Sequence, residues 1–252
     1  MAGHSKWANI KHRKAAQDSR RGKIFTKLIR ELVVAAKAGG PNPDDNPRLR
    51  AAVEKALGAN MRRDTVDKAI SRGVGAGDSN NYDELTYEGY APGGVAILIE
   101  CMTDNRNRTA GEVRHVFNKR GGNLGTDGSV SYLFRRIGII SYSADIDEEA
   151  IFDAALEAGA NDVIFTEEGT VDLEIDFEEF LAVKDRLLDQ GFMPKDSDII
   201  MSATQQVQLD QAATEKLLAL VDDLEDLDDV QNVYSNATIP PDFWEICFTI
   251  LN

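Results

Sequence analysis

The chain has 252 residues, of which 42% are hydrophobic and 28% charged, a composition typical of a globular protein and not of a disordered chain. Its longest apolar run, Val95–Ile99, is far shorter than the roughly 20 residues that span a bilayer, and no apolar secretory signal opens the sequence, so we expect a cytoplasmic protein without a membrane partner. The formal net charge of −15 would by itself argue against a nucleic-acid partner.

The charge is distributed unevenly along the chain. Residues 1–77 hold 17 basic and 7 acidic side chains, 78–144 hold 7 and 8, and 145–252 hold 4 and 28. Such asymmetry predicts a polyanion-binding part attached to an acidic body, because cations gathered in one segment can neutralise phosphates that the average charge would repel. The alternative is that both charge blocks are solvated surfaces.

Residues 1–77 are predicted to form a small basic helical domain that begins, over 2–22, with a mobile arm or a frayed helix. Apolar residues recur at the helical period over 24–36, which predicts the first long helix. The second helix is expected to start with Asn46 as its N-cap and Pro47 at its first position. A third, short helix completes the domain.

Beyond a glycine-rich linker, the chain alternates strands and helices. Residues 94–135 are predicted as strand–helix–strand, the last 50 residues supply another such unit, and helix–strand–strand–helix–strand lies between them. This order fits an α+β fold class with two ferredoxin-like units after the helical domain. We expect residues 78–144 plus 205–252 to form a discontinuous α+β domain into which an acidic α+β domain, 145–204, is inserted; a simple tandem order is the alternative.

Two strands joined by a tight connection are predicted over Val130–Phe134 and Ile137–Tyr142. The preceding turn, Gly121–Gly125, fits a helix C-cap, or alternatively a loop that closely approaches an RNA or ribosomal backbone. Between an earlier strand and helix, Asp104–Thr109 offers capping residues beside two arginines, which indicates an anion site.

No pattern in the sequence predicts an enzyme. Walker A, GxSxG and HExxH motifs are missing, and the two cysteines have no metal-binding spacing, so we expect no catalytic residue, no metal and no cofactor. The acidic run 222–229 lacks the Gly and Glu positions of an EF-hand. It is predicted to be the solvated face of a helix, with a weak divalent-ion site, a docking surface for a basic partner or a metal-dependent hydrolase as alternatives.

The basic segments predict where phosphate would bind, because the first 37 residues alone hold ten Lys and Arg. Rings at positions 7 and 12 could stack on bases. The residues predicted to bind nucleic acid are Lys6, Trp7, Lys11, His12, Arg13, Lys14, Arg20, Arg21, Lys23, Lys27, Arg48, Arg50, Arg106 and Arg108.

Seven stretches of the sequence closely resemble the YebC family. They are Gly3-His4-Ser5-Lys6-Trp7, Lys11-His12-Arg13-Lys14-Ala15, Arg21-Gly22-Lys23, Asn46-Pro47-Arg48-Leu49-Arg50, Tyr87-Glu88-Gly89-Tyr90, Asp104-Asn105-Arg106-Asn107-Arg108-Thr109 and Gly121-Gly122-Asn123-Leu124-Gly125. The departures from the family pattern are small: Arg62 stands where a proline is expected, and Ala91 replaces a glycine.

The resemblance implies three domains, a cytoplasmic location and a non-enzymatic role in gene expression. Bacterial members of the family are generally described as transcriptional regulatory proteins, and the family also includes the mitochondrial translational activator of cytochrome c oxidase subunit I. We therefore expect a DNA-binding transcriptional regulator; the alternative is a translation factor that binds ribosomal RNA and acts where proline-rich nascent chains stall. The oligomeric state stays open, with a monomer favoured.

Overall fold

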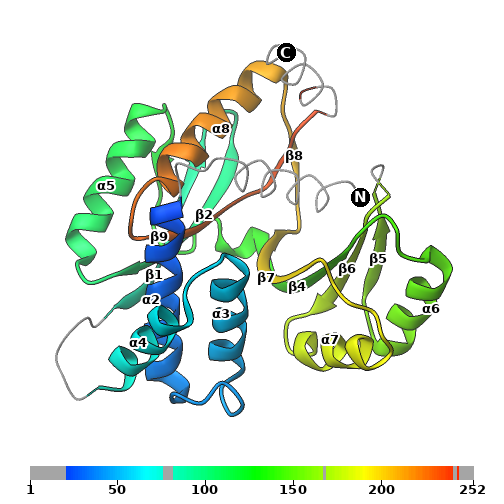
Figure 1. The fold of residues 1–252 in the computed structure, drawn as a ribbon. Helices are drawn as coiled ribbons and strands as arrows, with labels where there is room; N and C mark the ends of the chain where they lie inside the picture. The colour runs from blue at the N-terminus through cyan, green and yellow to red at the C-terminus, as the bar shows by residue number, and fades with distance from the viewer. Residues whose placement is uncertain (1–20, 76–81, 167–168, 241–242, 244–252) are drawn as a thin grey trace, which may run out of the picture. The chain divides into compact units, whose positions relative to one another are not determined.

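The computed structural model describes residues 21–75, 82–166, 169–240 and 243. The described chain is an α+β protein that divides into two compact units (Figure 1). Of the described residues, the first unit takes those up to 131, 209–235 and 243, and the second unit takes 132–208 and 236–240. Within the described residues, no helix is long and apolar enough to cross a membrane.

The first unit begins with the three predicted helices, α2 (Arg21–Gly39), α3 (Pro47–Gly58) and α4 (Arg63–Val74). Their apolar stripes form one core, to which Leu32, Leu49 and Val66 each contribute a fully buried side chain. The predicted N-cap is confirmed: Oδ1 of Asn46 accepts a hydrogen bond from the backbone N–H of Leu49 at 3.1 Å.

The same unit holds a four-stranded antiparallel sheet in the order β3-β1-β2-β9. Its strands are β1 (Asp83–Ala91), β2 (Val95–Thr103), β3 (Asn123–Leu124) and β9 (Val230–Ser235), and its helices are α5 (Arg106–Lys119) and α8 (Gln211–Glu225). Because β2 is buried along almost its whole length, it reads in the sequence as a continuous apolar run.

The second unit is built around another antiparallel sheet, in the order β5-β6-β4-β7. Its elements are the 3₁₀ turn η2 (Ser131–Leu133), β4 (Phe134–Tyr142), α6 (Glu148–Ala158), β5 (Asp162–Phe165), β6 (Val171–Asp176), α7 (Phe180–Asp189), β7 (Asp196–Ala203), β8 (Val207–Gln208) and β10 (Ala237–Thr238). Both helices pack on the same sheet face, where Ile140, Ile151 and Leu187 share one core.

The two sheets have the same arrangement with a different chain connection. In each, a central strand leads through a helix to an edge strand (β2–α5–β3 and β4–α6–β5), a third strand pairs between those two, and a helix leads to the opposite edge (α8–β9 and α7–β7). The third strand follows β5 in the second unit, whereas β1 precedes β2 in the first. The predicted α+β class is confirmed, and the strand order is that of a ferredoxin-like unit, in the first case circularly permuted.

The strand prediction around residue 134 is wrong in one respect. Phe134–Tyr142 is one continuous strand, and it pairs with β6 and β7 in the second unit, so this stretch does not belong with 78–133. Arg135 and Arg136 do not turn the chain, because both stay in register with β7, opposite Ser202 and Met201. Their side chains contact Glu174 and the ring of Phe177.

Candidate nucleic-acid interface

The basic face of α2 lies against the C-terminal end of α8. Lys23 Nζ lies 3.0 Å from the carbonyl oxygen of Asp226 and 3.3 Å from its Oδ1, and Lys27 Nζ lies 3.0 Å from the carbonyl oxygen of Glu225. The last carbonyls of a helix carry negative partial charge and attract cations. Two of the predicted phosphate contacts, Lys23 and Lys27, are therefore engaged within the protein.

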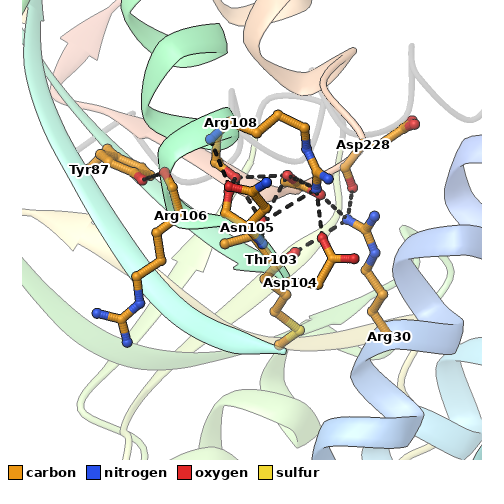
Figure 2. Close-up of polar contacts among 11 residues, drawn as sticks. Arg30, Tyr87, Thr103, Asp104, Asn105, Arg106, Arg108 and Asp228 are labelled. Carbon is orange, nitrogen blue, oxygen red and sulfur yellow. Dashed lines mark hydrogen bonds and ion pairs between the residues drawn. The ribbon is translucent and has the colours of Figure 1, made fainter. Parts of the chain in front are cut away.

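One turn further along α2, Arg30 binds Asp229, which follows α8. Figure 2 shows the side chain of Arg30 beside Asp228, the residue before Asp229. Its Nη1 lies 3.0 Å from Oδ1 of Asp229 and also donates to the carbonyl oxygens of Met102, at 3.2 Å, and Asp228. The Asp229 side chain is only 1% exposed. A charge buried to this extent needs an opposite charge beside it, and Arg30 supplies one through this ion pair.

The end of β2 and the first turn of α5 supply the hydrogen-bond donors to Asp229. Oδ2 accepts hydrogen bonds from Arg108 Nη2 at 2.6 Å, Thr109 Oγ1 at 2.7 Å and Thr103 Oγ1 at 3.0 Å. Burial raises the pKa of Asp229, but these donors and Arg30 together outweigh burial and hold the pKa below its ordinary value. The predicted cluster of arginine and capping residues is present, and its anion is the protein's own carboxylate.

Arg48 connects two elements of the first unit. Its Nε lies 2.8 Å from Oε1 of Glu31 in α2, and its Nη2 lies 2.9 Å from Oε2 of Glu84 in β1. Arg50 is bound more locally, since its Nε donates to the carbonyl oxygen of Pro43 at 3.3 Å. Both predicted contacts are exposed enough to meet a ligand, but each already has protein acceptors.

The acidic run 222–229 binds cations of the same unit. Asp223 accepts Arg120 Nε at 2.8 Å and Lys119 Nζ at 2.9 Å, and these two cations hold its pKa well below the usual range. The expectation of a solvated acidic face is wrong for Asp229, which is buried, and incomplete for Asp223 and Asp226, which are partly exposed and paired.

The cations that remain available lie mainly on α4. Arg62, just before α4, and Arg63, its first residue, make exposed ion pairs at 3.2 and 3.3 Å with acidic side chains of α4. Lys68 and Arg72 are exposed and pair with none of the residues that the structure describes. Among the arginines whose side chains the structure describes, only Arg72 and Arg114 of α5 lack a hydrogen bond, an ion pair and a ring contact.

The structure describes the side chains of six of the fourteen residues predicted to bind nucleic acid. Arg106 is described, and its Nε pairs with Oδ2 of Asp83 at 2.8 Å. Arg21 opens α2, but its side chain is outside the description. Outside the described residues lie Lys6, Trp7, Lys11, His12, Arg13, Lys14 and Arg20. For all of these, nucleic-acid contact stays a prediction.

Sequence reasoning did not single out Arg30, Asp229 or Arg114. Arg30 follows Lys23 and Lys27 at helical spacing, so the shared face was visible, but nothing local marks its partner 199 residues later. Arg114 carries no sequence signal of its own, since its lack of a partner is a property of the folded chain.

The glycine turn after α5 is a helix C-cap. Gly121 has a φ of +75°, and the N–H of Gly122 returns to the carbonyl oxygen of Phe117 at 2.9 Å. The next loop is held by Glu88, which is 7% exposed and accepts the backbone N–H groups of Gly128 and Val130 at 2.8 and 2.6 Å. The glycine turn therefore has a structural role as a helix C-cap. The tip of the loop that follows it, residues 126–128, is exposed.

The described residues contain no group of three or more His, Cys, Asp and Glu side chains placed to hold a metal ion. Cys101 is a buried free thiol whose pKa is raised to about 12, mainly by burial and then by the nearby charge of Asp229. A thiol of this kind stays protonated and unreactive at neutral pH.

The fold and its charges define a class of protein: a helical domain with exposed cations, joined to two α+β units of ferredoxin-like strand order. Comparison with known families agrees with this description. The family model for the TACO1/YebC protein N-terminal domain matches residues 5–76, and the model for the TACO1/YebC second and third domain matches residues 82–237. The chain belongs to the TACO1/YebC family.

Its relatives cover nearly the whole chain. The "Probable transcriptional regulatory protein" of Hahella chejuensis is 61% identical over 97% of this chain and 98% of its own length, and the "Transcriptional regulatory protein PmpR" of Pseudomonas aeruginosa is 62% identical over 96% and 98%. A crystal structure of a conserved hypothetical protein from Aquifex aeolicus matches with a TM-score of 0.81 and 47% identity, covering 88% of this chain and 92% of that one.

Proposed function

We propose that this protein is a non-enzymatic regulator of gene expression that acts in the cytoplasm and binds duplex DNA through its helical domain. The observation that carries the proposal is the exposed pair of cations on α4, Lys68 and Arg72. Most other described cations of the first unit are bound to carboxylates or carbonyl groups, whereas these two lie one helical turn apart on one exposed helix face, where both can neutralise phosphates of the same nucleic acid. The names of the relatives support a role in transcription.

The connection between α3 and α4 also supports contact with a duplex. Four residues, 59–62, join the two helices, and Asn60 within this turn has a φ of +62°. Two helices joined by so short a turn form the unit that helix-turn-helix proteins use, with the second helix facing the DNA. The buried side of α4, centred on Val66 and Ile70, packs in the core and leaves the cationic side exposed.

The proposal keeps the predicted phosphate contacts of residues 6–21 and adds Lys68 and Arg72. The paired cations Lys23, Lys27 and Arg108 would reach a phosphate only by exchanging a protein acceptor for it. The same exchange would be needed for Arg48, Arg50 and Arg106. We therefore expect their substitution to change stability more than affinity.

The test is a salt titration of affinity with fluorescent duplexes enriched from genomic fragments and their scrambled counterparts. Changing Lys68 and Arg72 together to Ala should weaken binding and reduce the slope of log K against log salt by about 2, since each phosphate contact contributes nearly one unit. Lys216→Ala, an exposed lysine of α8, is the matched control and should leave the slope unchanged. Equal affinity for selected and scrambled duplexes would rule out sequence-specific regulation.

The second candidate is a translation factor that binds ribosomal RNA. It is favoured by the charge of residues 132–208, which hold 18 acidic and 5 basic side chains and would be repelled by a long duplex. A folded RNA that only the basic part of the chain enters avoids this repulsion. Co-sedimentation with ribosomes, lost when Lys11, Arg13 and Lys14 are all changed to Ala, would support this candidate, and crosslinking with sequencing would separate ribosomal RNA from genomic DNA.

A further inference from the structure

Three large apolar side chains lie together on the surface of the second unit. Phe152 and Leu156, one helical turn apart on α6, are 40% and 53% exposed, and Phe165 at the end of β5 is 44% exposed. The rings of Phe152 and Phe165 stack with their centroids 6.3 Å apart. We call these three residues the α6–β5 patch; clustered exposed apolar side chains of this size mark interaction surfaces.

The core of the unit does not account for the patch. The buried face of α6 is formed by Ile151, Ala154, Ala155 and Ala158, which pack against the sheet. Phe152 and Leu156 lie beside this face and project to solvent. Leaving two such side chains exposed forgoes the hydrophobic stabilisation that burial would give, so a partner that covers them would recover it.

The patch lies at an open edge of the sheet. Within the described residues β5 pairs with β6 on one side and with no strand on the other. An edge strand presents free backbone N–H and C=O groups to any chain that lies beside it. An incoming polypeptide can thus find backbone hydrogen bonds next to the apolar anchors.

The surroundings of the patch are acidic. The exposed positions of α6 include Glu148, Glu149, Asp153 and Glu157, and the helix has no basic residue. Arg186, near the C-terminal end of α6, pairs with Glu179 at 3.8 Å. A second copy of this chain would bring a second set of the same carboxylates to the interface, and such like charges repel. Charge complementarity instead favours a cationic occupant.

From this combination we propose that the α6–β5 patch is a docking surface for a basic, amphipathic polypeptide segment of another protein. The occupant places apolar side chains on Phe152, Leu156 and Phe165 and its Lys and Arg side chains opposite Asp153 and Glu157. This interaction is separate from the phosphate contacts on α4, since it uses apolar and acidic side chains of the other unit.

The test measures binding of the full chain to a fluorescein-labelled peptide of roughly 14 residues in which leucines and lysines alternate, so that an extended strand presents leucines on one face and lysines on the other. Changing Phe152 and Leu156 together to Ser should weaken binding by at least about tenfold. Asp153→Asn with Glu157→Gln, which leaves the apolar side chains in place, should weaken binding about threefold or more and reduce its dependence on salt.

Two control variants make the result specific. Met193→Ser removes an apolar side chain that is 75% exposed outside the patch, and Asp127→Asn with Glu215→Gln removes two exposed charges from the first unit. Both should bind like the unchanged protein. Absence of saturable binding, equal binding of a peptide with Glu in place of Lys, or equal losses in patch and control variants would each overturn the proposal.

Discussion

Three separate stretches of the chain contact Asp229: Arg30 in α2 forms an ion pair with it, and Thr103 at the end of β2 and Arg108 with Thr109 in α5 donate hydrogen bonds to it. A buried carboxylate is unfavourable alone and acceptable only when its charge and lone pairs are satisfied. This residue therefore holds the helical domain, the sheet and the start of α5 together.

Replacing Asp229 by Asn should be strongly destabilising, because it leaves the partly buried Arg30 facing a neutral side chain. We expect a loss of about 3 kcal/mol in the free energy of unfolding, measured by urea denaturation. Asp104→Asn removes the exposed partner of the same Arg108 and should cost less than about 1 kcal/mol. Equal losses for the two variants would show that Asp229 is not the centre of the cluster.

Two glycines allow a matched test of packing. A Cβ at Gly138 would stand 2.1 Å from Cδ2 of Phe180, while a Cβ at Gly111, on the exposed side of α5, would meet nothing within 4 Å. Gly138→Ala should lower the free energy of unfolding by about 2 kcal/mol through overpacking, whereas Gly111→Ala should raise it by about 0.5–1 kcal/mol through helix propensity. Thermal and urea unfolding of both variants check the opposite signs.

Among the elements, α3 depends most clearly on one side chain. Asn46 caps α3, because its Oδ1 accepts a hydrogen bond from the N–H of Leu49. Its Nδ2 also donates to the carbonyl oxygens of Ala35 and Gly40, at 2.7 and 3.0 Å, so it joins the end of α2 to the start of α3. Asn46→Ala should cost about 2 kcal/mol in unfolding free energy. The exposed Asn42→Ala should cost less than about 0.5 kcal/mol, and a similar cost for both would contradict the capping role.

The helices and their caps were predictable because their signals are local. Asn46 and Pro47 adjoin the helix that they start, and the glycines after α5 adjoin the helix that they end. Strand partners were harder: Phe134–Tyr142 was recognised only in part and assigned to the wrong neighbours, since sheet pairing is decided by residues far away in the chain. The contacts of the candidate site were the least predictable part of the structure, because the partner of Lys23 lies 203 residues away in the sequence.

For the whole molecule, the net charge of −15 does not reveal that basic and acidic segments pair with each other inside the protein. The basic α2 and the acidic end of α8 belong to segments of opposite net charge, and they meet in the first unit through Lys23, Lys27 and Arg30. Sequence analysis assigned Lys23 and Lys27 to an external partner because it treated residues 1–77 as a separate domain, although it expected 205–252 to return to the first α+β domain.

This pairing predicts acid sensitivity. The folded-state pKa values of Glu88, Asp223 and Asp229 lie below their ordinary values, so these groups release protons more readily in the folded chain than in the unfolded one. Their stabilisation is complete above an unfolded pKa of about 4 and is lost as the pH falls through the lower folded values. The free energy of unfolding should thus change little from about pH 7 to 5 and fall steeply below about pH 4.

Urea titrations at pH 7, 5, 4 and 3 would measure this dependence. The Asp229→Asn variant should show a shallower fall, because one of the groups responsible has been removed. A stability that stays constant down to pH 3 would contradict the role of these carboxylates.

The interruption of the first unit by residues 132–208 has a consequence for how the protein is made. A chain emerging from the ribosome releases its N-terminal helices first, but α8, β9 and Asp229 arrive only after the inserted unit has been synthesised. The second unit's four-stranded sheet and both of its helices are complete by residue 203, so they can fold while the first unit is still missing its edge strand β9 and Asp229, the carboxylate partner of Arg30. The unit that starts first during synthesis therefore waits for the main sheet of the other, and Lys23, Lys27 and Arg30 lack their partners at and just after the end of α8 throughout that interval.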